Sequence, residues 1–478
     1  MYNSKLIAYL KVLTAEELKQ LSRFMQSPYF FEKPPAPVLQ HLLTFLRPFH
    51  PDFPKEKVNK AAAFTYCFPG QAFDQKKIEF KMYDLFKVIE QFIVQHFTST
   101  QTIDHQLVQL RFLRERGLAH HFDLTIKRIR RAQQKRTERG AVFYRQQFEL
   151  AREVMLKESR RRLRGSDLNL PQVHQSLDID YLVNKLEYAC HLLAQSKHHL
   201  PLEAAPHLTF LQYLQPALAA GHYADIPQVQ LYFAALQWLQ EEKEPSASFT
   251  KELKKYRHAL PADQLKSIHT LYRNYCVRKY NEGEEKYLHY LYDIYCMSLE
   301  EGLLFNNGGL LQSTMQNMVS IGLKLRKYDW VHQFLQQYRD QIVDTTAPEE
   351  VYSFNLARYH FALRQFEEAL DCMPTEYEDL YYKIEARLLE VKIYYEQDSE
   401  LLDHKMQACK VYLHRISNAL LPKVQQEGFN NFIDFLKQIC HPRTFKNEKR
   451  IEKLQAKLAA TKVITDREWL AEKLATLK

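Results

Sequence analysis

Apolar residues recur at helical spacing along almost the whole chain, and the first segment shows the pattern clearly. Leu18, Leu21 and Met25 follow one another at i, i+3 and i+7, which places them on one face of a helix. Thr14 precedes this stripe and Glu17 lies three residues later, the spacing of a capping box. The pattern predicts a helix that starts after Thr14 and ends near Ser27-Pro28.

Three further short helices are expected in the first 100 residues. A proline-rich connection leads into the second, Pro54 opens a third that ends before Pro69-Gly70, and Asp74 caps a fourth. We interpret residues 1–100 as a small helical N-terminal module. A helix-turn-helix DNA reader is an alternative for such a module, but its lysines are balanced by acidic residues, so a basic recognition face is missing.

Residues 101–165 change in character and carry a strong positive charge. Phe122, Ile126 and Ile129 define the apolar face of one amphipathic helix there, and a further helix follows. Residues 111–170 hold 17 Lys and Arg against 7 Asp and Glu. Beside the apolar face lie Lys127, Arg128, Arg130, Arg131, Lys135, Arg136 and Arg139. These residues are candidates for nucleic-acid binding through phosphates, and the alternative is a solvated outer face of long helices.

A helix-turn-helix pattern recurs in the second half of the chain. Phe366 lies nine residues after Ala357, and Ala369 lies three residues after Phe366. A similar spacing links Met318-Val319 with Tyr328 and Val331. This resembles the tetratricopeptide repeat, in which small residues let two helices approach and an aromatic residue fills the gap between them. Corresponding positions in the second helices are Leu288, Val331, Ala369 and Leu402. The steps between them are 43, 38 and 33 residues, so the repeats are degenerate.

The resemblance spans residues 177–415 and implies an all-α, right-handed solenoid of helix pairs. In such solenoids the first helix of each pair lines a concave wall that contacts a protein or peptide partner. Mapped onto this sequence, the wall positions are mostly polar. They are Arg273, Tyr280, Asn281, Gln316, Ser320, Lys324 and Arg358.

Linkers and charge suggest four parts. Residues 165–171 form the clearest linker, after which a helix is expected from about Asp178, and Asp466 is a candidate N-cap near the C-terminus. We therefore expect an N-terminal module (1–100), a basic long-helix segment (101–165), repeats (172–440) and a pair of capping helices (441–478).

Composition argues against common enzyme classes. The 11 glycines form neither a G-x-G-x-x-G nor a G-x-x-x-x-G-K loop, and the histidines show no metal-ligand spacing. The seven cysteines include no C-x-x-C, as expected for a reduced cytoplasmic protein. The N-terminal pattern does not predict a signal peptide, and no apolar run is long enough for us to expect a membrane span. We expect no cofactor, no metal and no catalytic residues.

Two classes of function follow from these observations. The first is a non-catalytic scaffold that binds a protein or peptide on the concave wall. The second is a regulator that contacts nucleic acid through the basic helices 111–164. The sequence determines neither the partner nor the oligomeric state, because the repeat residues are packing residues.

Overall fold

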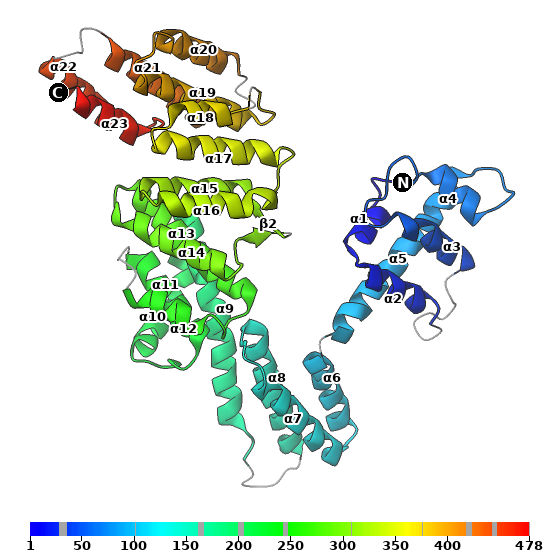
Figure 1. Cartoon of the computed structure of the whole chain (residues 1–478). Helices are drawn as coiled ribbons and strands as arrows, with labels where there is room; N and C mark the ends of the chain where they lie inside the picture. Colours follow the sequence, from blue (N-terminus) through cyan, green and yellow to red (C-terminus); the bar gives the residue numbers. More distant parts are fainter. Residues whose placement is uncertain are drawn as a thin grey trace. The chain divides into compact units, whose positions relative to one another are not determined.

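The computed structural model is dominated by α-helices, as the sequence pattern predicted (Figure 1). It describes residues 1–27, 36–100, 102–160, 167–198, 205–241, 247–306, 308–374, 376–416, 423–441 and 447–477. Within these ranges the chain forms two compact units, Met1–Lys185 and Leu186–Lys478, which divide inside one long helix. Among the described helices, none combines the length and apolarity needed to cross a membrane.

The first unit begins with the N-terminal helices and continues into the basic helices. Its elements are α1 (Lys5–Val12), α2 (Ala15–Met25), α3 (Pro37–Leu46), the 3-10 helix η1 (Arg47–Phe49), α4 (Lys60–Cys67), α5 (Gln75–Thr100), α6 (Thr102–Glu115), α7 (Ala119–Gln134), α8 (Ala141–Arg160) and the start of α9 (Leu170–His198). Helices α1–α5 enclose one hydrophobic core that extends from Leu6 to Phe92. A smaller core joins α6, α7 and α8 around Phe122 and Leu150.

Local signals placed several of these helices correctly. The capping box is present: the Thr14 hydroxyl accepts from the Glu17 amide, and the Glu17 carboxylate accepts from the Thr14 amide. Asp74 caps α5 by accepting from the Lys77 amide at 3.0 Å. Proline 54, in contrast, opens only a turn, because the Asn59 side chain accepts from the Ala62 amide and starts α4 at Lys60.

The long helix α9 begins earlier than the sequence suggested. It starts at Leu170 rather than near Asp178, directly after Asn169, whose φ of 59° turns the chain before the helix. Pro171 lies in the first turn, where its missing N–H has no helical partner to lose. The expected linker therefore ends inside a helix, and its residues 161–166 lie outside the described part of the chain.

The second unit contains the remaining helices and a small sheet. Its elements are α10 (Ala205–Ala219), α11 (Pro227–Glu241), α12 (Ala247–Tyr256), α13 (Ala262–Asn281), α14 (Lys286–Glu300), β1 (Phe305–Asn306), β2 (Gly309–Leu311), α15 (Gln312–Lys324), α16 (Tyr328–Tyr338), η2 (Arg339–Gln341), β3 (Ile342–Val343), α17 (Pro348–Ala362), α18 (Phe366–Cys372), α19 (Leu380–Glu396), α20 (Leu402–Arg415), α21 (Lys423–Cys440), α22 (Glu448–Ala460) and α23 (Arg467–Thr476). In the sheet, β2 lies between β1, its antiparallel neighbour, and β3, its parallel neighbour.

Neighbouring helices of this unit pack in sequence order. The pairs α13/α14, α15/α16, α17/α18 and α19/α20 are in contact, and α13, α15, α17 and α19 follow one another within the unit (Figure 1). Small residues lie at the crossings: Ala357 and Ala369 are fully buried between α17 and α18. Helices α19–α23 share one further core, so the C-terminal pair α22 and α23 completes the packing of the preceding helices.

Candidate functional site

The first helices of the pairs bring polar side chains together, and these include five of the seven expected wall residues. The Gln316 amide of α15 donates to the Tyr381 hydroxyl of α19 at 2.7 Å. The Arg358 guanidinium of α17 donates to the Ser320 hydroxyl of α15 at 2.8 Å. These bonds join α15, α17 and α19 through half-buried side chains. We call this surface, together with Tyr280, Lys324, Glu385 and Lys392, the polar wall.

The C-terminal helix contributes an acidic residue to the polar wall. Glu468 of α23 accepts a hydrogen bond from the Tyr280 hydroxyl of α13 at 2.8 Å. The same carboxylate pairs with Lys324 Nζ at 2.9 Å, and Lys324 also donates to the Tyr280 hydroxyl at 2.7 Å. Burial opposes the charge on Lys324, but its bonds to Tyr280 and Glu468 outweigh that effect and raise its pKa.

Asp466 adds a second acidic group at the same place. Asp466 occupies the N-cap position of α23, as expected, but its side chain makes no cap hydrogen bond, and its carboxylate pairs with Lys392 Nζ at 2.6 Å. Burial would raise the pKa of Asp466, yet the positive charges of Lys392, Arg358 and Lys324 outweigh it and lower that pKa. Its side chain as a whole remains 34% exposed.

Among the acids of the polar wall, Glu385 of α19 is the one whose ionised form is disfavoured. Burial raises its pKa, and the nearby negative charge of Asp466 adds to the effect, although Lys392 and Arg358 counteract it. The wall thus contains three cations, Lys324, Arg358 and Lys392, and three acids. Two of the acids, Asp466 and Glu468, come from the segment that starts α23, and the third is Glu385. Asp466 and Glu468 supply the acidic partners of Lys392 and Lys324 respectively.

Two expected wall residues do not join these contacts. Arg273 of α13 donates to the Thr270 hydroxyl at 2.9 Å and lies over the Tyr295 ring at 5.2 Å, and burial lowers its pKa. Asn281, at the end of α13, is exposed and makes no side-chain hydrogen bond within the described residues. Arg273 therefore acts inside the packing of α13 and α14, whereas Asn281 lies at its margin.

The sequence pattern did not identify as wall residues Tyr381, Glu385, Lys392, Asp466 and Glu468, of which Asp466 was expected only as a helix cap. The contacts that place them join residues far apart in the sequence: Tyr280 and Glu468 are 188 residues apart, and Lys324 and Glu468 are 144 apart. Their own sequence surroundings carry no motif. The repeat spacing gives one signal for Tyr381. This residue lies on α19, the first helix of the pair that follows α17 and α18.

The basic helices present their cations to solvent. Lys127, Arg128, Arg130 and Arg131 lie on the exposed face of α7, and Lys135, Arg136 and Arg139 follow its end. Arg136 donates to the Gln146 side chain at 3.2 Å, and Arg139 lies 5.5 Å from the centre of the Phe143 ring. Within the described residues, none of the seven pairs with a carboxylate. Their charge is therefore available to an external anion.

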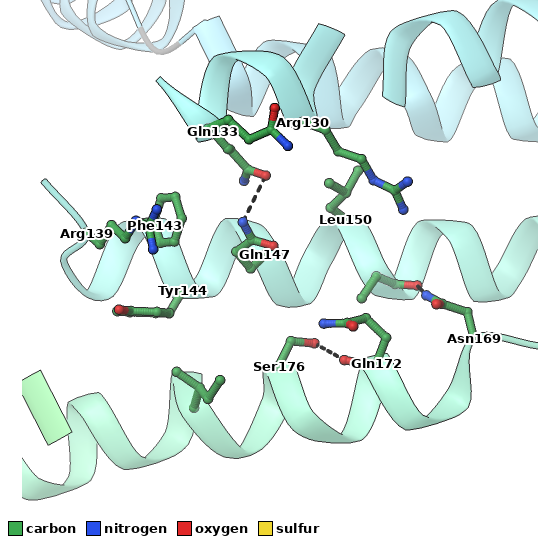
Figure 2. Close-up of a pocket in the computed structure, with 13 residues that line it drawn as sticks. Arg130, Gln133, Arg139, Phe143, Tyr144, Gln147, Leu150, Asn169, Gln172 and Ser176 are labelled. Carbon is green, nitrogen blue, oxygen red and sulfur yellow. Dashed lines mark hydrogen bonds between the residues drawn. The ribbon is translucent and has the colours of Figure 1, made fainter. Parts of the chain in front are cut away.

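A pocket of about 430 Å³ lies between α7, α8 and α9 in the first unit (Figure 2). Arg130 and Gln133 reach it from α7, Phe143 and Gln147 from α8, and Ser176 from α9. Gln147 donates to the Gln133 side-chain oxygen at 3.1 Å across the interface of α7 and α8. The lining combines amide and guanidinium groups with buried aromatic rings.

No cluster of three or more His, Cys, Asp or Glu side chains able to hold a metal ion occurs in the described ranges. Comparisons with protein-family models, with curated proteins and with solved structures find no match for this chain. Any functional conclusion therefore depends on the residues of the polar wall and of the basic helices.

Proposed function

We propose that the chain is a non-catalytic scaffold that binds a protein or peptide partner on the polar wall. In this proposal α13–α20 form a right-handed solenoid similar to tetratricopeptide repeats, and the wall is its concave side. The ordered pairing of neighbouring helices and the buried Ala357 and Ala369 at one crossing support that arrangement. The seven cysteines are all free, which is consistent with action in the cytoplasm.

One observation carries the proposal: the polar wall already holds an acidic segment of its own chain. Asp466 and Glu468 are bound by Lys392, Lys324 and Tyr280 through hydrogen bonds of 2.6–3.0 Å. Charge-assisted bonds of this length are strong, and they also require a defined geometry. An acidic segment of a partner can take the places of Asp466 and Glu468 on the wall and make the same contacts. We therefore expect the partner to present acidic residues.

The experiment is a pull-down from native lysate with nuclease, using three forms of the full chain. Replacing Lys324, Arg358 and Lys392 by Gln should abolish partner recovery, because the wall loses its cations. Replacing Glu468 by Gln should increase recovery, because Lys324 and Tyr280 are released from the chain's own carboxylate. Circular dichroism checks that each variant is folded.

The matched control removes three positive charges from the same unit but away from the wall. Lys251, Lys254 and Lys255 of α12 are exposed and serve this purpose. The control should recover the partner as the native chain does. If the wall variant folds and still recovers the same partner, the polar wall is not the binding site.

The second candidate function is nucleic-acid binding by the basic helices, favoured by the seven exposed cations, which have no carboxylate partner among the described residues. Each phosphate contact releases counterions, so five or six contacts would lower the affinity on the order of a thousandfold between about 50 and 200 mM salt. We expect only weak binding of mixed-sequence DNA and RNA at physiological salt. Submicromolar affinity there, lost when Arg128, Arg131, Lys135 and Arg139 are replaced by Gln, would favour this function over the scaffold.

A further inference from the structure

The pocket between α7, α8 and α9 has a lining suited to a negatively charged ligand. No acidic side chain lines it among the described residues, although two arginines and several amides do. Its volume of about 430 Å³ falls within the range of roughly 300–1,000 Å³ that is typical of small-molecule sites. The two arginines give this lining a positive charge, which attracts an anion.

Gln133 provides a buried hydrogen-bond donor that has no acceptor. Its side chain is only 3% exposed, and its oxygen accepts from Gln147 at 3.1 Å. Its amide nitrogen is buried and makes no hydrogen bond to any described residue. A buried donor without an acceptor has lost its hydrogen bond to water and gained no other, which is unfavourable. A ligand oxygen in the pocket would remove this cost.

Arg130 and Arg139 lie toward opposite ends of the pocket, as Figure 2 shows. Both side chains are exposed, and neither forms an ion pair within the described residues. Arg139 is held against the Phe143 ring. Guanidinium groups bind the oxygens of phosphate and carboxylate groups through paired hydrogen bonds. The amides of Gln133, Gln147 and Gln172 lie between the two ends (Figure 2).

We propose that this pocket binds an elongated small organic anion with a phosphate or carboxylate group at each end and a polar body between them. One end meets Arg130, the other meets Arg139, and a hydroxyl or carbonyl oxygen of the body accepts from the Gln133 amide. The site is separate from the polar wall, and its occupation does not depend on a protein partner.

Isothermal titration calorimetry on the full chain tests the proposal with four probes. Fructose 1,6-bisphosphate carries two phosphates and glucarate carries two carboxylates on similar polyhydroxylated bodies, so their comparison identifies the preferred anionic group. Fructose 6-phosphate has one charged end and fructose has none. We expect at least one of the two-ended probes to bind, more tightly than fructose 6-phosphate, while fructose does not bind.

Three substitutions then locate the binding. Arg130→Gln and Arg139→Gln should each weaken it roughly 10- to 100-fold, the value of one charged hydrogen bond. Gln133→Glu keeps the oxygen that accepts from Gln147 but replaces the orphan donor by a carboxylate, so it should abolish binding. The matched control is Arg128→Gln with Arg131→Gln, which removes two exposed cations of α7 that do not line the pocket. This control should bind as the native chain does.

The proposal is overturned if neither two-ended probe binds at about 1 mM, which corresponds to roughly 4 kcal/mol of binding free energy. Fructose binding equal to that of the bisphosphate would also overturn it. The same holds if the folded Arg130 and Arg139 variants bind as well as the native chain, or if the control loses affinity as they do. In that last case the charge of α7 as a whole, rather than the pocket, attracts the probe.

Discussion

His269 is a buried histidine that stays neutral in the folded chain. It is 1% exposed on α13, and its Nδ1 lies 2.9 Å from the Ser298 hydroxyl of α14. Because that hydroxyl donates to the Ile294 carbonyl at 2.6 Å, we assign the ring as donor to Ser298. Burial lowers the pKa of His269 to about 4, and the nearby positive charge of Arg273 adds to the effect.

This histidine predicts a loss of stability in mild acid. Below about pH 6.5 the unfolded chain binds a proton at His269 that the folded chain does not bind until about pH 4. The free energy of unfolding should therefore fall across that window, by up to about 3 kcal/mol from this residue. His269→Gln, which cannot titrate, should flatten the fall in urea unfolding curves. Parallel curves for both chains between about pH 7 and 4.5 would contradict the assignment.

Glu385 predicts the opposite dependence on pH. Its pKa is raised in the fold, so the folded chain resists its ionisation more than the unfolded chain does. Stability associated with Glu385 is thus present below the ordinary glutamate pKa and is lost as pH rises. Glu385→Gln should stabilise the chain at neutral pH, and the gain should fade at about pH 4. Thermal melts at neutral pH and in acid measure this gain in stability. A lower melting temperature for Glu385→Gln at neutral pH would contradict a raised pKa of Glu385.

At the scale of elements, the crossing of α15 and α16 depends on a glycine. A Cβ on Gly322 would lie 2.4 Å from Val331 Cγ2 and 3.3 Å from the Trp330 ring. Val331 is fully buried and cannot easily move aside. Repeat spacing had identified Val331 as a packing residue, but it had not identified Gly322 as the small residue opposite it.

Gly322→Ala should therefore destabilise the chain. Overpacking costs typically about 1–3 kcal/mol, while the higher helix propensity of alanine returns about 1 kcal/mol. We expect a net loss of about 1 kcal/mol by urea unfolding. In a Val331→Ala background the same substitution should be neutral or stabilising, because its clash is gone. Equal losses in both backgrounds would mean that the crossing does not limit this position.

The helix ends that were predicted best are those that depend on residues close in sequence. The capping box at Thr14 and the cap at Asp74 need only three residues of context, and both are present. Asp466 takes the N-cap position as predicted, but its backbone is left-handed and its carboxylate binds Lys392, 74 residues away, instead of the helix end. The early start of α9 likewise depends on the turn at Asn169, whose amide side chain donates to the Ala151 carbonyl of α8 at 3.3 Å.

At the scale of the whole molecule, residues 1–100 contain a complete core of their own. Every buried residue of that core lies between Leu6 and Phe92, and α5 contacts α1, α2, α3 and α4. We predict that residues 1–100 expressed alone unfold cooperatively, because a core of this kind can support a domain of about 100 residues. Thermal and urea unfolding by circular dichroism should give coincident transitions.

The control for this prediction is a chain of residues 102–160, whose helices α6, α7 and α8 share a much smaller core. It should melt gradually, since so little apolar surface is buried. If residues 1–100 also melt without a cooperative transition, their core depends on the rest of the chain.

By itself, the sequence determined that this protein is all-α, which residues face the core, and where most of the charge lies. These properties follow from spacing and capping within a few turns of one helix, so they can be read locally. Only the tertiary structure decided that Glu468 meets Tyr280 and Lys324, and that Gln133 lies buried beside the pocket between α7, α8 and α9. Such contacts depend on which helix faces meet after packing, and packing residues repeat without specifying their distant partners.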